Sequence, residues 1–238
     1  MTTTSTKAAR ILFVYPNERH MSTVPPAIAV LSQLLKDAGH IVSLFDTTFY
    51  DFDDDISQND AEATLVDTLQ VRPIADIDDD DLHFTKTDHS PINDLRKLID
   101  EFSPNLLAVS CTETTFPRGL RLVSETRDYG IPNIFGGVFP TFAPQLVMDN
   151  DCIDMLCVGE GENALVALAN AIANRRDYTN ISNLWVRQLD GFVFKNKIGN
   201  AVDINSLPVT IDMGLFGEKR FYRPMGGKIR RLLPVETH

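Results

Sequence analysis

Four short polar stretches are the places where this chain of 238 residues could do chemistry. Each follows an apolar run, and together they cover residues 16–20, 110–115, 136–141 and 159–162. Glycine leaves room for a ligand to approach the backbone, and serine and threonine hydroxyls both donate and accept hydrogen bonds. Such residues indicate a slot for a bulky, weakly charged ligand with an extended polar tail. The alternative interpretation is that the glycines only permit tight turns and leave no space for a ligand.

Several common ligand sites are poorly supported by the residues in these stretches. The pattern G-x-x-x-x-G-K-[ST] is absent and no G-x-G-x-x-G follows the first apolar run, which argues against ATP, GTP and NAD. A phospho-acceptor receiver domain would need acidic residues after the first and third strands and a lysine after the fifth. This chain has Asn17, Ser110 and Gly159 there. A flavin mononucleotide site would need a Ser/Thr/Gly phosphate loop after the first strand, which 16–20 does not supply.

The polar stretches are positioned by alternating strands and helices. Apolar runs of strand length predict buried strands over 11–15, 41–45, 106–110, 133–135 and 153–158. Apolar residues at helical spacing predict helices over 25–38, 92–102, 120–129, 144–148 and 161–174. This alternation predicts an α/β, flavodoxin-like (Rossmann-like) doubly wound five-stranded parallel sheet of order 2-1-3-4-5. A β-hairpin over 184–187 and 192–195 is expected at an edge of the sheet.

The predicted fold brings the four stretches to one edge. In open parallel sheets, ligands bind beyond the carboxyl ends of the strands, near the point where strand order reverses. We expect residues 1–205 to form this domain, with an acidic insertion at about 47–90 and a helix near 61–69. Residues 206–238 lack a sustained apolar period and are expected to be a linker.

Charge and cysteine content limit the partners and the compartment. The formal charge of −11 argues against nucleic acid, because phosphate binding needs a basic face. No apolar run approaches the roughly 20 residues of a membrane span, and no signal peptide precedes the first strand. Three cysteines are an odd number, two of them in strand-like runs, so we expect a reducing cytoplasm rather than a disulfide framework.

The ordered set of motifs resembles a known family. The residues concerned are Pro25-Pro26 through Ala38-Gly39-His40, Val109-Ser110-Cys111-Thr112, Phe135-Gly136-Gly137-Val138-Phe139-Pro140-Thr141 and Val158-Gly159-Glu160-Gly161-Glu162. Over roughly residues 10–175 they resemble the N-terminal cobalamin-binding domain of radical S-adenosylmethionine (radical SAM) proteins. The resemblance implies a cobalamin-binding module that is not catalytic alone, and methyltransferase-like or rearrangement chemistry in the full protein.

The resemblance also implies which residues contact cobalamin. They are Pro16, Asn17, Ser110, Cys111, Thr112, Glu113, Thr114, Gly136, Gly137, Val138, Phe139, Pro140, Thr141, Gly159, Glu160 and Gly161. For Glu160 and Glu162, stabilisation of a helix dipole is the alternative role, and Cys111 is also a candidate for packing. The D-x-H-x-x-G motif of methionine-synthase-type domains is missing, so the lower cobalt ligand is left open, with His20 one candidate. No catalytic residue and no metal ligand is assigned.

Further expectations concern the parent protein. Pro234–His238 resembles the first barrel strand that precedes a C-x-x-x-C-x-x-C cluster in this family, so we expect the chain to be truncated before that motif. The resemblance places the [4Fe–4S] cluster, S-adenosylmethionine and a radical SAM catalytic domain downstream. The alternative function is a cofactor-free interaction or scaffold domain. An enzyme acting alone is the weakest hypothesis, because no nucleophile–base pair is visible.

Overall fold

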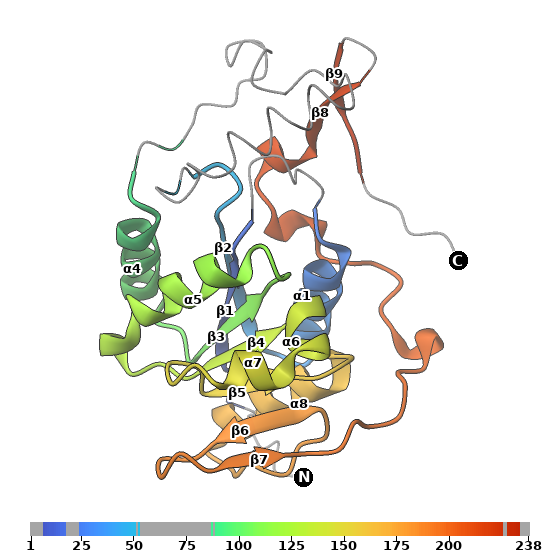
Figure 1. Ribbon diagram of the computed structural model, residues 1–238. Coiled ribbons are helices and arrows are strands. Elements are labelled where there is room, and N and C mark those ends of the chain that lie inside the picture. Colours follow the sequence, from blue (N-terminus) through green and yellow to red (C-terminus); the bar gives the residue numbers. More distant parts are fainter. Residues whose placement is uncertain are drawn as a thin grey trace.

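The computed structural model describes residues 7–17, 24–50, 52, 87, 89–225 and 228–233. Within these residues, a seven-stranded sheet is flanked by helices and accompanied by a small separate hairpin (Figure 1). The strands of the sheet are β1 (Arg10–Tyr15), β2 (Ile41–Asp46), β3 (Leu106–Ser110), β4 (Asn133–Gly136), β5 (Met155–Cys157), β6 (Leu184–Arg187) and β7 (Val193–Lys195).

The strand order confirms the predicted topology. The sheet runs β2-β1-β3-β4-β5-β6-β7, and the first five strands are parallel in the predicted order 2-1-3-4-5. The predicted hairpin is β6 and β7, which extend the sheet beyond β5 in antiparallel pairing. Strand order therefore reverses between β1 and β3, and this is the switch point at which α/β proteins bind ligands.

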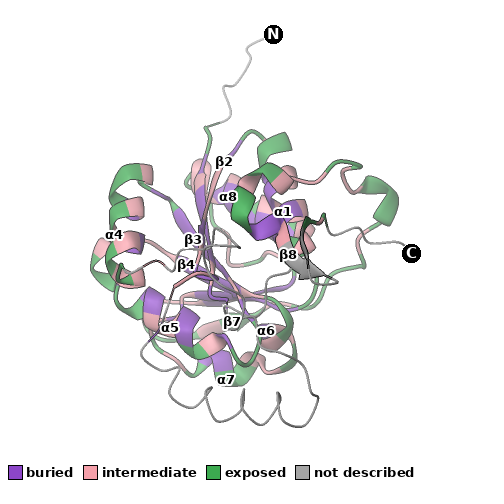
Figure 2. Cartoon of the chain, turned by 90° about the horizontal axis from the view of Figure 1, so that it is seen from above, coloured by how far each residue is buried: buried purple, intermediate pink, exposed green. Residues whose placement is uncertain are grey.

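Helices cover both faces of the sheet. They are α1 (Pro26–Asp37), α4 (Pro91–Phe102), α5 (Phe116–Ser124), α6 (Val138–Phe142), α7 (Pro144–Met148) and α8 (Glu162–Ala173). Figure 2 shows α1 and α8 on one side of the buried sheet and α4, α5 and α7 on the other. None of the described helices is long and apolar enough to cross a membrane.

The core follows from strand geometry. Successive side chains of a strand point to opposite faces, and parallel strands between two helical layers are buried on both. In β1, Ile11 and Phe13 therefore pack into the core under α1 and α8, while Leu12 and Val14 pack under α4 and α5. All four are at most 2% exposed, which makes β1 the centre of both cores.

One helix prediction was wrong in its details, and one short helix was not predicted. The helix expected over 120–129 begins earlier, at Phe116, because Pro117 suits the first helical turn. It ends at Ser124, and a separate 3₁₀ turn, η3 (Arg127–Tyr129), follows before Gly130 adopts the left-handed conformation. The short helix α6 was not predicted, because its five residues contain no helical repeat of apolar residues.

The segment expected to be a linker has local structure. It contains the turns η4 (Ile204–Ser206), η5 (Met213–Leu215) and η6 (Glu218–Phe221) and the hairpin of β8 (Tyr222–Met225) and β9 (Lys228–Arg231). Phe216 and Phe221 are buried in the core beside α1, and Asp212 accepts a hydrogen bond from Ser32 of that helix. This segment is therefore packed on the domain.

Part of the sequence interpretation lies outside the described residues. This holds for His20, the helix near 61–69, most of the acidic insertion and Pro234–His238. The described ends of the insertion meet, because Tyr50 and Thr87 form a parallel bridge. The Tyr50 hydroxyl also donates a hydrogen bond to Asp94 of α4 at 3.0 Å.

Candidate functional site

The polar stretches after β3, β4 and β5 meet at the carboxyl edge of the sheet. Ser110 and Gly136, the last residues of β3 and β4, lie directly opposite each other in the ladder. The stretch after β5 is joined to this edge by Thr141, whose hydroxyl accepts a hydrogen bond from the Gly159 amide at 3.1 Å. Parallel pairing thus brings together residues that are about 25 positions apart in sequence.

A cavity of about 190 Å³ opens at this edge. Its mouth is formed by Ser110, Gly136, Gly137, Gly159, Glu160 and Gly161. It continues between the sheet and the two helices on one face, where it is lined by Phe13, Ala108 and Ile134 of the sheet, Ala27 and Leu31 of α1, and Leu165 of α8. The crevice at the switch point is therefore open rather than filled by the protein's own side chains.

The glycines at the mouth have two different roles. Gly137 has φ +107°, and a Cβ placed there would lie 2.6 Å from the carbonyl oxygen of Cys111, so this glycine permits close packing of two loops. A Cβ on Gly136 would meet nothing nearer than the Cys157 Cβ at 4.0 Å, and one on Gly161 nothing nearer than Leu31 at 3.7 Å. The absence of side chains at Gly136 and Gly161 leaves space for the cavity.

Thr141 connects two of the loops instead of lining the cavity. Its hydroxyl donates to the Gly137 carbonyl at 2.8 Å and accepts from the Gly159 amide. One side chain thus holds the loop after β4 against the loop after β5. The sequence identified Thr141 as a site residue, and its position supports a role in shaping the mouth.

Asn183 holds the loop after β5 from the other side. Its side-chain amide donates to the Glu160 carbonyl at 2.9 Å and accepts from the Gly199 amide at 2.7 Å. The Glu160 carboxylate accepts a hydrogen bond from the Val202 amide at 2.6 Å. Asn183 is 8% exposed and has φ +70°, but it precedes β6 and no motif in the sequence identifies it.

The stretch after β1 contributes two buried residues to a different corner. The Asn17 amide donates to the Thr47 hydroxyl and its side chain donates to the Thr48 hydroxyl, both at 2.8 Å. Pro16 packs near Gly119 of α5, where an added Cβ would lie 3.2 Å from the proline ring. Neither Pro16 nor Asn17 lines the cavity; they join β1 to the end of β2.

The other predicted site residues lie around the mouth. Thr112, Glu113 and Thr114 are exposed on the turn after β3, and Val138 is 61% exposed at the start of α6. Phe139 packs on Phe116 with ring centroids 5.0 Å apart, and Pro140 is the buried residue of α6. The structure therefore brings these residues near the mouth without placing them in the cavity itself.

Two cysteine thiols lie near the site on opposite faces of the sheet. Cys157 lines the cavity, and burial raises its pKa to about 12, with a smaller contribution from the nearby Glu162 carboxylate. Cys111 packs in the core under α4 and α5, and burial raises its pKa to about 12 as well. Both thiols are therefore protonated at neutral pH, and Cys157 presents a neutral, weakly polar surface to a ligand.

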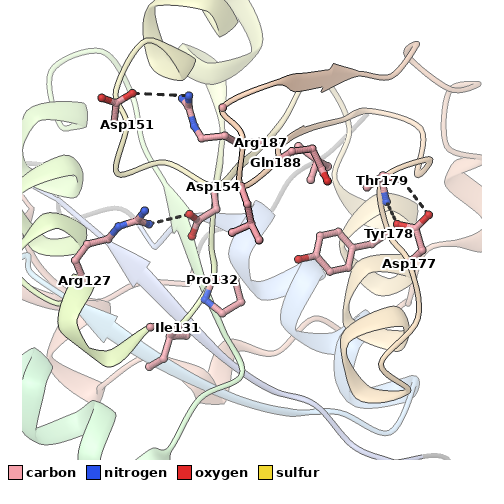
Figure 3. Close-up of a pocket in the computed structure, with 14 residues that line it drawn as sticks. Arg127, Ile131, Pro132, Asp151, Asp154, Asp177, Tyr178, Thr179, Arg187 and Gln188 are labelled. Atoms are coloured by element: carbon pink, nitrogen blue, oxygen red, sulfur yellow. Dashed lines mark hydrogen bonds and ion pairs between the residues drawn. The ribbon is translucent and has the colours of Figure 1, made fainter.

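A larger hollow of about 880 Å³ lies at the opposite, amino edge of the sheet (Figure 3). Four of its charged side chains form two pairs: Arg127 contacts Asp154 at 2.8 Å, and Arg187 contacts Asp151 at 3.8 Å. It lies at the wrong end of the strands for the switch-point rule, so the carboxyl-edge cavity is the candidate site.

A doubly wound sheet with a glycine-lined cavity at its switch point defines an α/β ligand-binding domain. A family model described as the B12 binding domain matches residues 17–169. This chain therefore belongs to the B12-binding domain family. No curated protein matches the chain significantly.

Two solved enzymes share the fold. The radical S-adenosylmethionine methyltransferase TsrM from Kitasatospora setae, solved with cobalamin and a [4Fe–4S] cluster, matches 84% of this chain at 22% identity and a TM-score of 0.57. The cobalamin-dependent S-adenosylmethionine radical enzyme OxsB, solved with aqua-cobalamin and S-adenosylmethionine, matches 82% at 16% identity and a TM-score of 0.54. The match covers 31% of the TsrM chain and 23% of the OxsB chain.

Proposed function

We propose that this chain is the cobalamin-binding module of a cobalamin-dependent radical SAM enzyme. Membership of the B12-binding domain family supports the cofactor, and the fold shared with TsrM and OxsB supports the parent class. In this proposal, the [4Fe–4S] cluster and S-adenosylmethionine belong to a separate catalytic domain, and methyl transfer or rearrangement takes place there. Three free cysteines support a reducing cytoplasm.

The observation that carries the proposal is the cavity beside α1 and α8. The nucleotide tail of cobalamin ends in a flat aromatic base, and a cavity of about 150 Å³ in another protein takes up benzene. The cavity of about 190 Å³ here is bounded by Leu31, Leu165 and the neutral Cys157 thiol, which suit an aromatic ring. Gly136 and Gly161 leave its mouth open for the polar part of the tail.

The residues of the chain would bind and orient the cofactor. When bound, cobalamin supplies a cobalt centre capable of organometallic chemistry. The Ser110 hydroxyl at the mouth can donate to or accept from the polar tail, and the loops held by Thr141 and Asn183 keep the mouth in a fixed shape. No histidine among the described residues lines the cavity, and His20 lies outside them.

The path of the C-terminal segment supports a catalytic domain facing this edge. Arg220 is 3% exposed, and its guanidinium lies 2.9 Å from the Asp46 carboxylate at the end of β2. The chain therefore returns to the carboxyl edge before the β8–β9 hairpin (Figure 1). A domain that followed in the parent protein would start beside the cofactor.

Retention of cobalamin by the purified chain tests the proposed function. The chain is mixed with excess hydroxocobalamin and passed through a gel-filtration column, aerobically and anaerobically. We expect about one equivalent of corrin absorbance to elute with the protein. Cobalamin that elutes only with small molecules, from a protein that unfolds cooperatively, would contradict the proposal and support a cofactor-free scaffold domain.

A further inference from the structure

The outer strand of the sheet is open on one side. β7 is the last strand of the seven-stranded sheet, and no strand that the structure describes pairs with its outer side (Figure 1). The Gln188 amide of the hairpin donates to the Phe192 carbonyl at 2.7 Å, so the backbone of Phe192 faces inward. Because backbone groups of an antiparallel strand alternate in direction, those of Val193 and Lys195 face outward.

This edge lacks the protection that edge strands usually have. Natural proteins guard such edges with proline or with lysine side chains that lie along them. Residues 191–196 contain no proline. Lys195 is the lysine of β7, but its ammonium donates to Gln145 of α7 at 2.7 Å and lies 4.4 Å from the centre of the Trp185 ring. These contacts hold the Lys195 side chain over one face of the sheet rather than along its edge.

Two exposed aromatic rings lie beside the outward backbone groups. Phe192 is 59% exposed and Phe194 is 38% exposed, and their ring centroids are 5.0 Å apart. Since they are two residues apart, both rings are on the same face of the sheet. Together they expose about as much surface as one whole phenylalanine, roughly 200 Å². Apolar surface next to an open strand edge indicates a site at which another strand binds.

We propose that β7 pairs antiparallel with β7 of a second copy of the chain, about a two-fold axis at Val193. In this register, Phe192 of each copy lies opposite Phe194 of the other. The outward groups of the two Val193 residues meet, so they exchange two hydrogen bonds. The two phenylalanines then occupy the closely spaced, non-hydrogen-bonded positions, where aromatic pairs across strands interact. Four rings therefore meet on one face of a continuous sheet.

Charge and position favour a second copy as the occupant of this edge. In the same register, Asp190 of each copy falls between Lys195 and Lys197 of the other. Opposite charges thus meet at both ends of the contact, which favours this register. The C-terminal segment returns to Asp46 at the end of β2, the strand at the opposite edge of the sheet. A domain that followed in the parent protein would therefore start at the far edge from β7.

The size of the contact predicts a weak dimer. With the flanking backbone, each copy buries roughly 400 Å², or roughly 800 Å² in total, which is the size of transient complexes. Sedimentation velocity at about 1 µM and about 200 µM protein measures the association, because a contact of this size forms only at the higher concentration. We expect a monomer at the lower concentration and a substantial fraction of dimer at the higher. A monomer at both concentrations would overturn the proposal.

Two substitutions in the hairpin locate the contact. Phe192→Lys removes an exposed ring and brings like charges near the two-fold axis, so we expect the Kd of the dimer to rise at least about 30-fold, as at an interface anchor. Val193→Pro removes the central hydrogen-bond donors at a position where proline is tolerated, because the N–H group faces away from β6, and should weaken the dimer similarly. Phe142→Lys, at a phenylalanine of α6 that is 84% exposed, is the matched control and should dimerise like the wild type.

Unchanged dimerisation in Phe192→Lys would place the contact elsewhere and overturn the proposal. Should Val193→Pro not fold, Phe192→Lys still gives the test, because it changes an exposed side chain. Hydrogen exchange measured by mass spectrometry checks the register: the Val193 amide should exchange more slowly at the higher protein concentration, and the Phe194 amide, which faces β6, should change less. An unchanged rate at Val193 in a protein that dimerises would overturn the pairing. These measurements need no cobalamin, so their failure is separate from failure of the proposed function.

Discussion

Filling the cavity from Gly136 is the sharpest test of where the cofactor tail binds. A Cβ at Gly136 meets no atom within ordinary contact except the Cys157 Cβ at 4.0 Å, so Gly136→Leu introduces no clash with the backbone. The leucine side chain adds four carbon atoms. At about 30 Å³ each, the volume of a water molecule, they occupy about 120 Å³. That is more than half of the cavity of about 190 Å³.

The size of the effect follows from the surface that the tail can no longer bury. An aromatic ring system buries roughly 150 Å² or more, and burial of apolar surface is worth about 25 cal/mol per Å². Excluding the base therefore costs about 4 kcal/mol, which is roughly 500- to 1,000-fold in Kd. We expect Gly136→Leu to lose this much affinity for hydroxocobalamin and to keep its affinity for cobinamide.

Titration calorimetry and thermal unfolding provide the measurement and its control. Gly217→Leu is the matched control, because a Cβ there meets nothing within 4 Å and the residue lies outside the cavity. It should bind cobalamin like the wild type. If Gly136→Leu folds with an unchanged Tm and binds cobalamin with unchanged affinity, the tail does not occupy this cavity and the reasoning is refuted.

Two further predictions concern the walls of the site. Thr141→Val keeps the shape of the side chain but removes the hydrogen bonds to Gly137 and Gly159. We therefore expect a loss of about 1–3 kcal/mol in unfolding free energy and faster hydrogen exchange at the Gly159 amide. An unchanged exchange rate would show that Thr141 does not hold this loop. Burial raises the pKa of Cys111 and Cys157 to about 12, above the ordinary value of 9.0, so these thiols ionise more readily in the unfolded chain. The unfolding free energy, measured by urea denaturation, should therefore fall as pH rises from about 9 toward 12. In a variant with both cysteines replaced by alanine, the unfolding free energy should fall less steeply over the same pH range. Equal slopes of unfolding free energy against pH in the two proteins would contradict this prediction.

The sheet was predictable because its strands are buried on both faces. Such strands appear in the sequence as short continuous apolar runs, as in residues 11–15 and 106–110, and turn residues separate them clearly from the helices. The helix α6 was not predictable in this way, because it is too short for an apolar repeat and its N-cap is Gly137, whose conformation depends on contact with Cys111. The start of α5 was missed because the polar turn before it contains few apolar residues.

The mouth of the cavity was also predictable, but its interior was not. Ser110 and Gly136 end parallel strands and Gly159 is the second residue after one, so topology alone brings them to the carboxyl edge. Leu31 of α1 belongs to a regular apolar helix face, which is the pattern of an ordinary core residue, and only the structure shows that it borders open space. The bridging role of Thr141 depends on side-chain direction, which spacing in the sequence does not encode.

A crystal structure of the chain with bound hydroxocobalamin would test the central claim most directly. We predict electron density for the aromatic base between the sheet and helices α1 and α8, in contact with Leu31 and Leu165. Density that places the nucleotide tail outside this cavity, with the base folded back beneath the corrin ring, would contradict the account.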